Sequence, residues 1–323
     1  MKIRKPRIVF LDAGTVDYGD LSLRPLEVFG KITVYHHSAP KEIASRLRQA
    51  EIAVANKCVF SRKILKASKN LRCIAVTATG FNNIDLAAAR ECGIAVCNVP
   101  GYSTDTVAQN TVALMLVLAG NLLKYNEAAH SGLWSRSPFF VYGAYPILEL
   151  RGKKLGIIGY GSIGKRVGQI AKALGMELMI SRIPGRVYPA KDKIKRLFFE
   201  KVIREADFVT LHTPLTDLTR DLINDRVLRK MKPSAFLLNC ARGGIVNEKA
   251  LLRALKSKQI AGAALDVLTE EPPPRNHILL GAPNLLLLPH VSWASREVRT
   301  RLIGEVAQNI RAFLKGRKRN RIV

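Results

Sequence analysis

The glycine-rich segment Gly159-Tyr160-Gly161-Ser162-Ile163-Gly164 constrains the fold of this chain more than any other feature. The run 155–158 before it is typical of a buried strand, and residues 165–174 after it are patterned as a helix. In such a unit the first glycine permits the tight turn and the second lets the backbone approach a pyrophosphate. The third lets the helix pack on the strand. The segment therefore predicts a Rossmann-like unit that binds a dinucleotide, with the helix N-terminus at Ser162 and Ile163 facing phosphate.

Short β-rich runs alternate with amphipathic segments along most of the 323 residues. This alternation is typical of parallel sheets whose strands are connected by helices. A break rich in Pro, Gly, Ser and Thr at residues 100–105 separates a first series of strands from a second series that begins near Lys153. Because a chain of this length suits two domains, we expect an α/β protein with two Rossmann-like, doubly wound parallel-sheet domains.

Three segments stand out between and after these two series. Residues 106–129 predict one long helix, whose apolar run 111–123 is shorter than the roughly 20 residues of a membrane span, so we expect it to be buried. Residues 131–148 are irregular and rich in aromatics, which indicates a lid or an arm that reaches a partner subunit. Residues 294–314 carry apolar side chains at helical spacing and predict a closing amphipathic helix.

The amino-acid composition indicates in which cellular compartment the protein is expected and which binding partners it is expected to have. Residues 1–7 are basic, but the apolar run of a signal peptide does not follow them. Five cysteines without a Cys-x-x-Cys pair disfavour a disulfide framework and a zinc site, so we expect a reducing, cytoplasmic setting. The net charge of +27 raises the idea of a nucleic acid or a membrane surface as partner. No basic module interleaved with aromatics accompanies it, and we expect neither partner.

The strand after the glycine helix bears on which dinucleotide binds. Sites for NAD usually end this strand with Asp or Glu, which holds the ribose 2′-hydroxyl. Here the strand ends in Ser181-Arg182, and Arg186 follows. Arginine attracts a 2′-phosphate that a carboxylate would repel, and it stacks on adenine. We therefore expect NADP(H), with NAD(H) as the alternative if Arg182 is an ordinary solvated loop residue.

Three polar motifs follow strands of the second series and carry Arg242, Glu271 and His290. Side chains placed after parallel strands are expected at the carboxyl edge of the sheet, where ligands bind. Arginine supplies planar donors to a carboxylate and a ketone, and histidine delivers a proton near neutral pH. A carboxylate beside the histidine orients it and favours its protonated form. The set fits reduction of a 2-keto acid by hydride from a nicotinamide and needs no metal.

Taken together, the ordered motifs resemble the D-2-hydroxyacid dehydrogenase family over nearly the whole chain. Residues 134–138 and 290–295 are similar to the branch of glycerate dehydrogenases and hydroxypyruvate/glyoxylate reductases. The matching segments are the glycine loop, Thr79-Gly80-Phe81-Asn82-Asn83-Ile84-Asp85, Asn98-Val99-Pro100-Gly101, Ala241-Arg242-Gly243-Gly244, Leu265-Asp266-Val267 with Glu271-Pro272, and Pro289-His290.

The resemblance implies a domain order and an assembly. Residues 1–102, completed by residues 292–323, would form the substrate domain, and residues 103–291 the dinucleotide domain. A cleft would lie between the domains, and the last helix would return to the first domain. The family is typically dimeric, with an arm around residues 131–145 that reaches across the interface and brings Trp134 near the neighbour's active site.

The resemblance also implies a role for each site residue. Arg242 would bind the substrate's carboxylate and keto oxygen, His290 would be the general acid, and Glu271 its partner. Lys57 and the backbone of Thr79 and Gly80 would complete the substrate site. Asp266 would touch the nicotinamide amide. The residues expected around the cofactor are Thr106, Gly159, Gly161, Ser162, Ile163, Gly164, Ser181, Arg182, His212, Thr213, Pro214, Cys240, Ala241, Arg242, Asp266, His290 and Trp293.

The implied activity is NAD(P)H-dependent reduction of a small 2-keto acid, such as hydroxypyruvate to D-glycerate or glyoxylate to glycolate. A phosphoglycerate-type dehydrogenase and a non-catalytic, dinucleotide-sensing corepressor are the open alternatives. Glu271 argues against a formate dehydrogenase, whose histidine pairs with Gln.

Two segments depart from the pattern of the family. Arg182 stands where relatives that use NAD have Asp, and Ser292-Trp293 replaces a pair of small residues. Trp293 would either narrow the pocket or pack in the core.

Overall fold

The computed structural model describes residues 5–323; residues 1–4, which begin the basic segment considered as a signal peptide, lie outside the described residues. The chain divides into two compact units. Unit 1 is the chain up to Ser103 together with Ala294–Val323, and unit 2 is Thr104–Trp293. The boundaries expected after residues 102 and 291 lie within two residues of this division.

Unit 1 is built on a five-stranded sheet in which every strand pair is parallel. The first strand of the chain lies between the second and the third, so Ile8 is aligned with Ile32 on one side and with Ile52 on the other. The direction in which successive strands are added therefore reverses at the first strand. Arg321 near the C-terminus adds an antiparallel bridge to Cys97 at the far edge. In spatial order the strands are β2 (Lys31–Val34), β1 (Arg7–Phe10), β3 (Ile52–Ala55), β4 (Cys73–Val76) and β5 (Ala95–Cys97).

The helices of unit 1 include the predicted closing helix, α11 (Arg296–Leu314). Its apolar stripe is buried at Val298, Leu302, Val306 and Ile310, as the spacing predicted. The other helical elements of this unit are η1 (Ala13–Thr15), α1 (Arg24–Glu27), α2 (Pro40–Leu47), α3 (Arg62–Ala67) and α4 (Leu86–Glu91).

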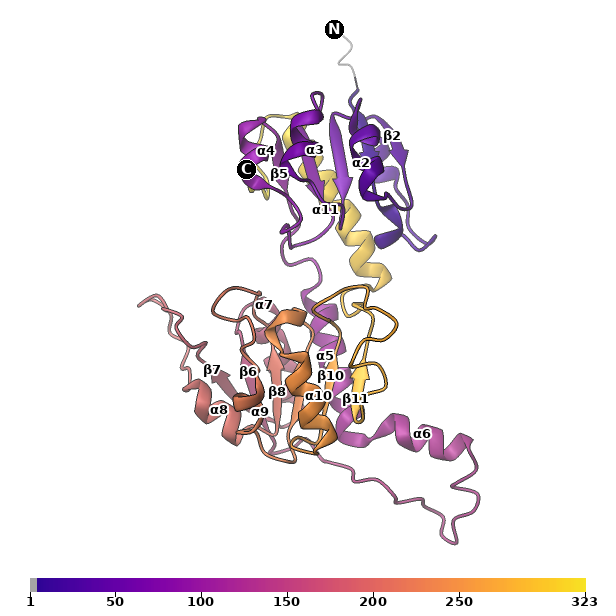
Figure 1. Cartoon of the computed structure of the whole chain (residues 1–323), viewed down its shortest axis with the longest axis vertical. Helices are drawn as coiled ribbons and strands as arrows, with labels where there is room; N and C mark the ends of the chain where they lie inside the picture. Colours follow the sequence, from indigo (N-terminus) through magenta and orange to yellow (C-terminus); the bar gives the residue numbers. More distant parts are fainter. Residues whose placement is uncertain (1–4) are drawn as a thin grey trace. The chain divides into compact units, whose positions relative to one another are not determined.

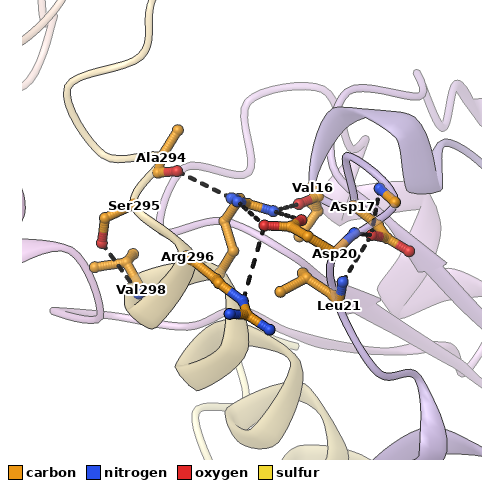
Figure 2. A network of polar contacts seen from close by, with 10 residues as sticks. Val16, Asp17, Asp20, Leu21, Ala294, Ser295, Arg296 and Val298 are labelled. Carbon is orange, nitrogen blue, oxygen red and sulfur yellow. Dashed lines mark hydrogen bonds and ion pairs between the residues drawn. The ribbon is translucent and has the colours of Figure 1, made fainter.

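A buried arginine ties the start of α11 to the loop after η1. Arg299 is 4% exposed, and its Nη1 and Nη2 donate to the two carboxylate oxygens of Asp20 at 2.6 and 2.8 Å. Its Nη1 also donates to Val16 O and its Nε to Ala294 O. Figure 2 shows Asp20 facing the first turn of α11, where Arg296 is a second cationic partner. The Arg299 guanidinium, opposed by partial burial, lowers the pKa of Asp20 to about 2.

Unit 2 is built on a six-stranded sheet, again with parallel pairs throughout. In spatial order its strands are β11 (Leu285–Leu287), β10 (Gly262–Leu265), β9 (Phe236–Asn239), β8 (Phe208–Leu211), β6 (Lys154–Ile158) and β7 (Glu177–Ser181). The two sheets confirm the expected fold class of two doubly wound, parallel-sheet units.

Helices cover both faces of the sheet in unit 2 (Figure 1). On one face α5 (Thr104–Gly120) and α7 (Ser162–Ala173) enclose an apolar core with the inward side chains of β6 and β8, such as Leu155 and Phe208. On the other face the core includes Val209 and Leu211, which alternate with Phe208 along β8. The elements of that face are α8 (Phe199–Glu205), α9 (Asp225–Leu228) and α10 (Glu248–Lys256), with η2 (Gly243–Ile245) before α10.

The expected single helix over residues 106–129 is wrong. The structure has α5 and then α6 (Leu122–His130), bent by 59°. Asn121 between them adopts a left-handed conformation with φ 47°, which stops the first helix. Within residues 5–323 no single helix has the length and hydropathy of a membrane span, and this bent pair meets that measure only when its two helices are taken together.

Candidate active site

The glycine loop lies where the strand order of unit 2 reverses. β6 is flanked by β7 on one side and β8 on the other, so a crevice is expected at the carboxyl ends of β6 and β8. Gly159 follows β6 with φ +94°, and a Cβ there would lie 2.3 Å from His212 O, just after β8. Only glycine fits this turn, which brings the predicted cofactor residues Gly159, His212 and Thr213 together.

The other two glycines of the loop suit a bound pyrophosphate. A Cβ at Gly164 would lie 2.2 Å from Gly159 O, so its absence lets α7 pack on the end of β6. A Cβ at Gly161 would meet no heavy atom within 4 Å, which leaves space in front of the loop. Gly161 is the N-cap of the 12-residue α7, and Ser162 and Ile163 begin the helix with its free N–H groups. These residues fit the phosphates of a dinucleotide.

The end of β7 is cationic. Arg182 is exposed, and its guanidinium lies 5.4 Å from the ring centre of Phe198. Arg186, also exposed, lies over Tyr188 at 5.3 Å. Ser181 is 1% exposed, and its hydroxyl donates to Arg182 O at 2.7 Å, which supports the turn that displays the arginine.

His212 is a neutral residue beside the glycine loop. Burial lowers its pKa to about 3, because an imidazolium would lose its hydration there. Its Nε2 lies 2.9 Å from the hydroxyl of Thr210. Thr213 is 4% exposed, whereas Pro214 is exposed. His212 therefore carries no charge near neutral pH.

Arg242 lies on a short loop after β9 that a buried amide organises. Asn239, fully buried, donates from Nδ2 to Arg242 O at 2.8 Å and accepts the Ala241 N–H at 3.0 Å. The Arg242 side chain is exposed, with Nη1 donating to Ala241 O. A Cβ at Gly243 would lie 2.0 Å from the carbonyl carbon of Leu268, so this loop packs directly on the loop after β10. Sequence reasoning missed Asn239.

Glu271 and His290 form the predicted pair. His290 Nδ1 lies 2.6 Å from Glu271 Oε2, and Glu271 Oε1 accepts the Leu268 N–H at 3.0 Å. The two side chains are 27% and 32% exposed, so the pair is accessible from solvent on one side. His290 has φ 56°, a conformation that the residues around it must hold. The loops after β9, β10 and β11 thus bring Arg242, Glu271 and His290 to one edge of the sheet.

Asp266 holds the segment that carries His290. It is 2% exposed, its backbone oxygen accepts the His290 N–H at 2.9 Å, and its carboxylate accepts the N–H groups of Val291 at 2.8 Å and Ser292 at 3.0 Å. Burial raises the pKa of the Asp266 carboxyl, against the effect of those N–H donors. Each carboxylate oxygen therefore has a backbone partner, a supporting role that sequence reasoning did not foresee.

Three further side chains, those of Asn110, Trp293 and Cys240, contact this segment. Asn110 on α5, not predicted, donates to Ser292 O at 2.9 Å. Trp293 donates from Nε1 to His290 O at 3.1 Å and packs partly buried against the α5–α7 core. Cys240 is 9% exposed, and burial raises the pKa of its thiol to about 11, so it stays protonated. Thr106 is a buried residue in the first turns of α5.

The substrate residues predicted in unit 1 lie on loops after β3 and β4. Asp12, buried after β1, accepts the N–H groups of Lys57 at 2.6 Å and of its two neighbours, and so fixes the loop after β3. Thr79 donates to Val99 O, and Asn98 donates to Thr79 O, so the backbone at Thr79 and Gly80 is held on both sides. Across residues 5–323 no group of three or more His, Cys, Asp or Glu side chains is arranged to hold a metal ion.

The comparisons with known proteins agree with this geometry. The family described as D-isomer specific 2-hydroxyacid dehydrogenase, NAD binding domain, matches residues 112–292. A glycerate dehydrogenase of Methylorubrum extorquens is 39% identical over 317 residues, which cover 97% of this chain and 98% of the relative. A hydroxypyruvate reductase of Blautia hydrogenotrophica is 36% identical over 313 residues, 96% of this chain and 97% of the relative.

A solved structure shows the same architecture. The NADPH-dependent glyoxylate/hydroxypyruvate reductase of Sinorhizobium meliloti, in complex with NADP and malonate, has a TM-score of 0.79 at 26% identity, over 96% of this chain and 94% of that one. The glycine loop, the Glu–His pair and these relatives agree, and the chain belongs to the D-isomer specific 2-hydroxyacid dehydrogenase family of nicotinamide-dependent oxidoreductases.

Proposed function

We propose that this chain reduces a small 2-keto acid to its D-2-hydroxy acid, with hydroxypyruvate and glyoxylate as the substrates. The observation that carries the proposal is the Glu271–His290 pair, with its 2.6 Å contact, on the same sheet edge as Arg242. The names of the relatives, glycerate dehydrogenase and hydroxypyruvate reductase, support this substrate class.

His290 is proposed as the proton donor. Glu271 takes the Nδ1 side of the imidazole, so Nε2 is the nitrogen left to face a substrate. A bound nicotinamide supplies the hydride to the keto carbon. As that bond forms, the carbonyl π pair moves onto oxygen, which takes the proton from His290 Nε2. The Glu271 carboxylate holds the ring in position for that transfer.

Arg242 is proposed to bind the substrate's carboxylate and keto oxygen, because its guanidinium is exposed and permanently charged. Asn239 fixes the backbone on both sides of Arg242 and limits where the side chain can reach. Lys57 and the backbone at Thr79 and Gly80 are proposed as further contacts for the carboxylate. The rigid loops on which they lie support this role.

NADPH is proposed as the preferred reductant. Arg182 and Arg186 place two guanidinium groups after β7, where a dinucleotide's adenosine ribose is expected. A 2′-phosphate would gain charge-assisted hydrogen bonds there, and the 2′-hydroxyl of NADH would not. The structural relative from Sinorhizobium meliloti, described as NADPH-dependent, supports this assignment.

A homodimer is proposed through α6 and the segment 131–148, which extend from the rest of unit 2 (Figure 1). This arm exposes Trp134 by 53%, Phe139 by 72%, Phe140 by 90% and Ile147 by 69%. So much exposed apolar surface on one segment is typical of a subunit interface. We expect light scattering to give twice the chain mass, and Phe140→Asp to lower that mass. A monomeric wild type would contradict the dimer.

A reducing cytoplasm is proposed as the location of the protein. The free thiols of all five cysteines fit that compartment.

Initial rates test the proposed activity. Purified protein is assayed with hydroxypyruvate, glyoxylate and 3-phosphohydroxypyruvate, each with NADPH and with NADH. We expect turnover of the first two acids, with NADPH giving the higher kcat/KM. A preference for the phosphorylated acid would instead favour a phosphoglycerate-type enzyme. Binding of NADPH without reduction of any keto acid would refute the enzymatic proposal and favour a sensing role.

A further inference from the structure

Unit 2 contains a second histidine–glutamate pair, outside the residues assigned above. His277 Nε2 lies 3.2 Å from Glu248 Oε2. The two side chains are only 9% and 13% exposed, so this pair is more enclosed than His290 and Glu271. A buried carboxylate is costly unless its oxygens have donors, so the partners of Glu248 define what the pair does.

The hydrogen bonds around this pair fix its proton positions. The Leu279 N–H donates to His277 Nδ1 at 3.3 Å, so the proton of the neutral ring is on Nε2 and is donated to Glu248 Oε2. The other oxygen, Glu248 Oε1, accepts the Thr269 N–H at 2.7 Å. Glu248 is the first residue of α10, whose N-cap Asn247 accepts the Ala250 N–H. The helix and His277 thus hold the carboxylate against the backbone of Thr269.

The segment Leu268–Thr269 lies between the proposed catalytic side chains. The Leu268 N–H donates to Glu271, and Gly243, next to Arg242, packs against the Leu268 carbonyl. A shift of this segment would therefore displace the Arg242 loop and the carboxylate that orients His290. An angström of displacement at reacting groups costs rate rather than affinity.

We propose that Glu248, oriented by His277, is a positioning residue for the catalytic site. It holds the Thr269 amide and so sets the place of the segment that contacts both Glu271 and the Arg242 loop. The role rests on the proposed keto-acid reduction, because its effect is on that rate. Neither residue touches substrate or cofactor in this scheme, so their removal acts on kcat and leaves dinucleotide binding in place.

The test compares four variants of the full chain. Glu248→Ala removes the carboxylate and His277→Ala removes its orienting donor. His277→Gln keeps an N–H donor near the Nε2 position. Asp207→Ala is the matched control, because Asp207 likewise accepts one backbone N–H, from Lys154, and one side-chain donor, Lys232, but lies before β8 at the opposite edge of the sheet.

We expect Glu248→Ala to lower kcat for hydroxypyruvate by about tenfold or more, with KM for NADPH within about twofold of wild type. The rate should fall because Glu271 is then held less well beside His290. His277→Gln should restore most of the rate that His277→Ala loses, and Asp207→Ala should lower Tm without lowering kcat. Hydrogen exchange in peptide 266–272 should quicken in Glu248→Ala and not in Asp207→Ala.

Two results would overturn the positioning role. One is a folded Glu248→Ala enzyme with wild-type kcat. The other is unchanged exchange in peptide 266–272, which stays measurable even if the variant has too little activity to assay. A wild-type protein that reduces no keto acid would be a distinguishable outcome. It would refute the proposed function itself, and the positioning role of Glu248 with it.

Discussion

Replacing Glu271 with glutamine tests the contact on which the chemistry depends. The substitution keeps the size of the side chain and an oxygen for the Leu268 N–H, but puts an amide N–H opposite His290 Nδ1. The imidazole must then present a lone pair at Nδ1, the opposite of the arrangement with the carboxylate. The variant therefore loses both the charge and the orientation that Glu271 supplies.

The size of the effect follows from the geometry. A hydrogen bond to a charged group contributes roughly 1.5–3 kcal/mol, and the exposure of this pair, 27% and 32%, places it at the lower end. About 1.5 kcal/mol corresponds to roughly a tenfold change in rate, so Glu271→Gln should lower kcat/KM by about tenfold or more.

The assay is the pH profile of kcat/KM for hydroxypyruvate at saturating NADPH, from pH 5 to 9. Glu270→Gln is the matched control, since it removes the same charge from the exposed neighbouring residue. We expect the control profile to coincide with wild type and the rate of Glu271→Gln at neutral pH to be lower by about tenfold or more. A Glu271→Gln profile that coincides with wild type would refute the assignment of Glu271 as the partner of the proton donor.

The remaining predictions concern the cofactor loop and the fold. Arg182→Asp should lower kcat/KM for NADPH relative to NADH, and an unchanged ratio would refute the 2′-phosphate assignment. Gly161→Ala should weaken NADPH binding measured by fluorescence while sparing Tm, because a Cβ there meets no heavy atom within 4 Å. Gly164→Ala should lower Tm, because its Cβ would meet Gly159 O. The pKa of Asp20, lowered to about 2 by Arg299, means that its contribution to stability is complete above about pH 4 and lost toward pH 2. Asp20→Asn should therefore lower Tm in calorimetry at pH 7, and the difference from wild type should shrink from pH 4 to 2.

Local patterns in the sequence predicted the fold class and the contact between Glu271 and His290. The glycine loop could be interpreted because its strand and helix are adjacent in the chain, and Gly159 and Gly164 perform the steric roles predicted for them. The pairing of Glu271 with His290 followed from their placement after neighbouring strands and from the family resemblance. The apolar spacing of α11 likewise predicted its buried face.

Supporting contacts could not be predicted, because they join residues far apart in the chain. Asn110 reaches Ser292 across 182 positions, and nothing in the local sequence distinguishes that amide from a solvated one. Asp266 was expected at the cofactor, yet its carboxylate accepts two backbone N–H groups, which only the folded loop reveals. The break at Asn121 was missed because one left-handed residue interrupts an otherwise helical pattern.

His290 is proposed to deliver the proton in a nicotinamide-dependent reduction of a 2-keto acid. That role is tested by kcat/KM of His290→Ala against wild type with hydroxypyruvate and NADPH, together with the Kd for NADPH of each protein. We expect a loss of roughly 10²–10⁴-fold in kcat/KM with little change in Kd. A His290→Ala enzyme with near-normal kcat/KM would show that His290 is not the proton donor.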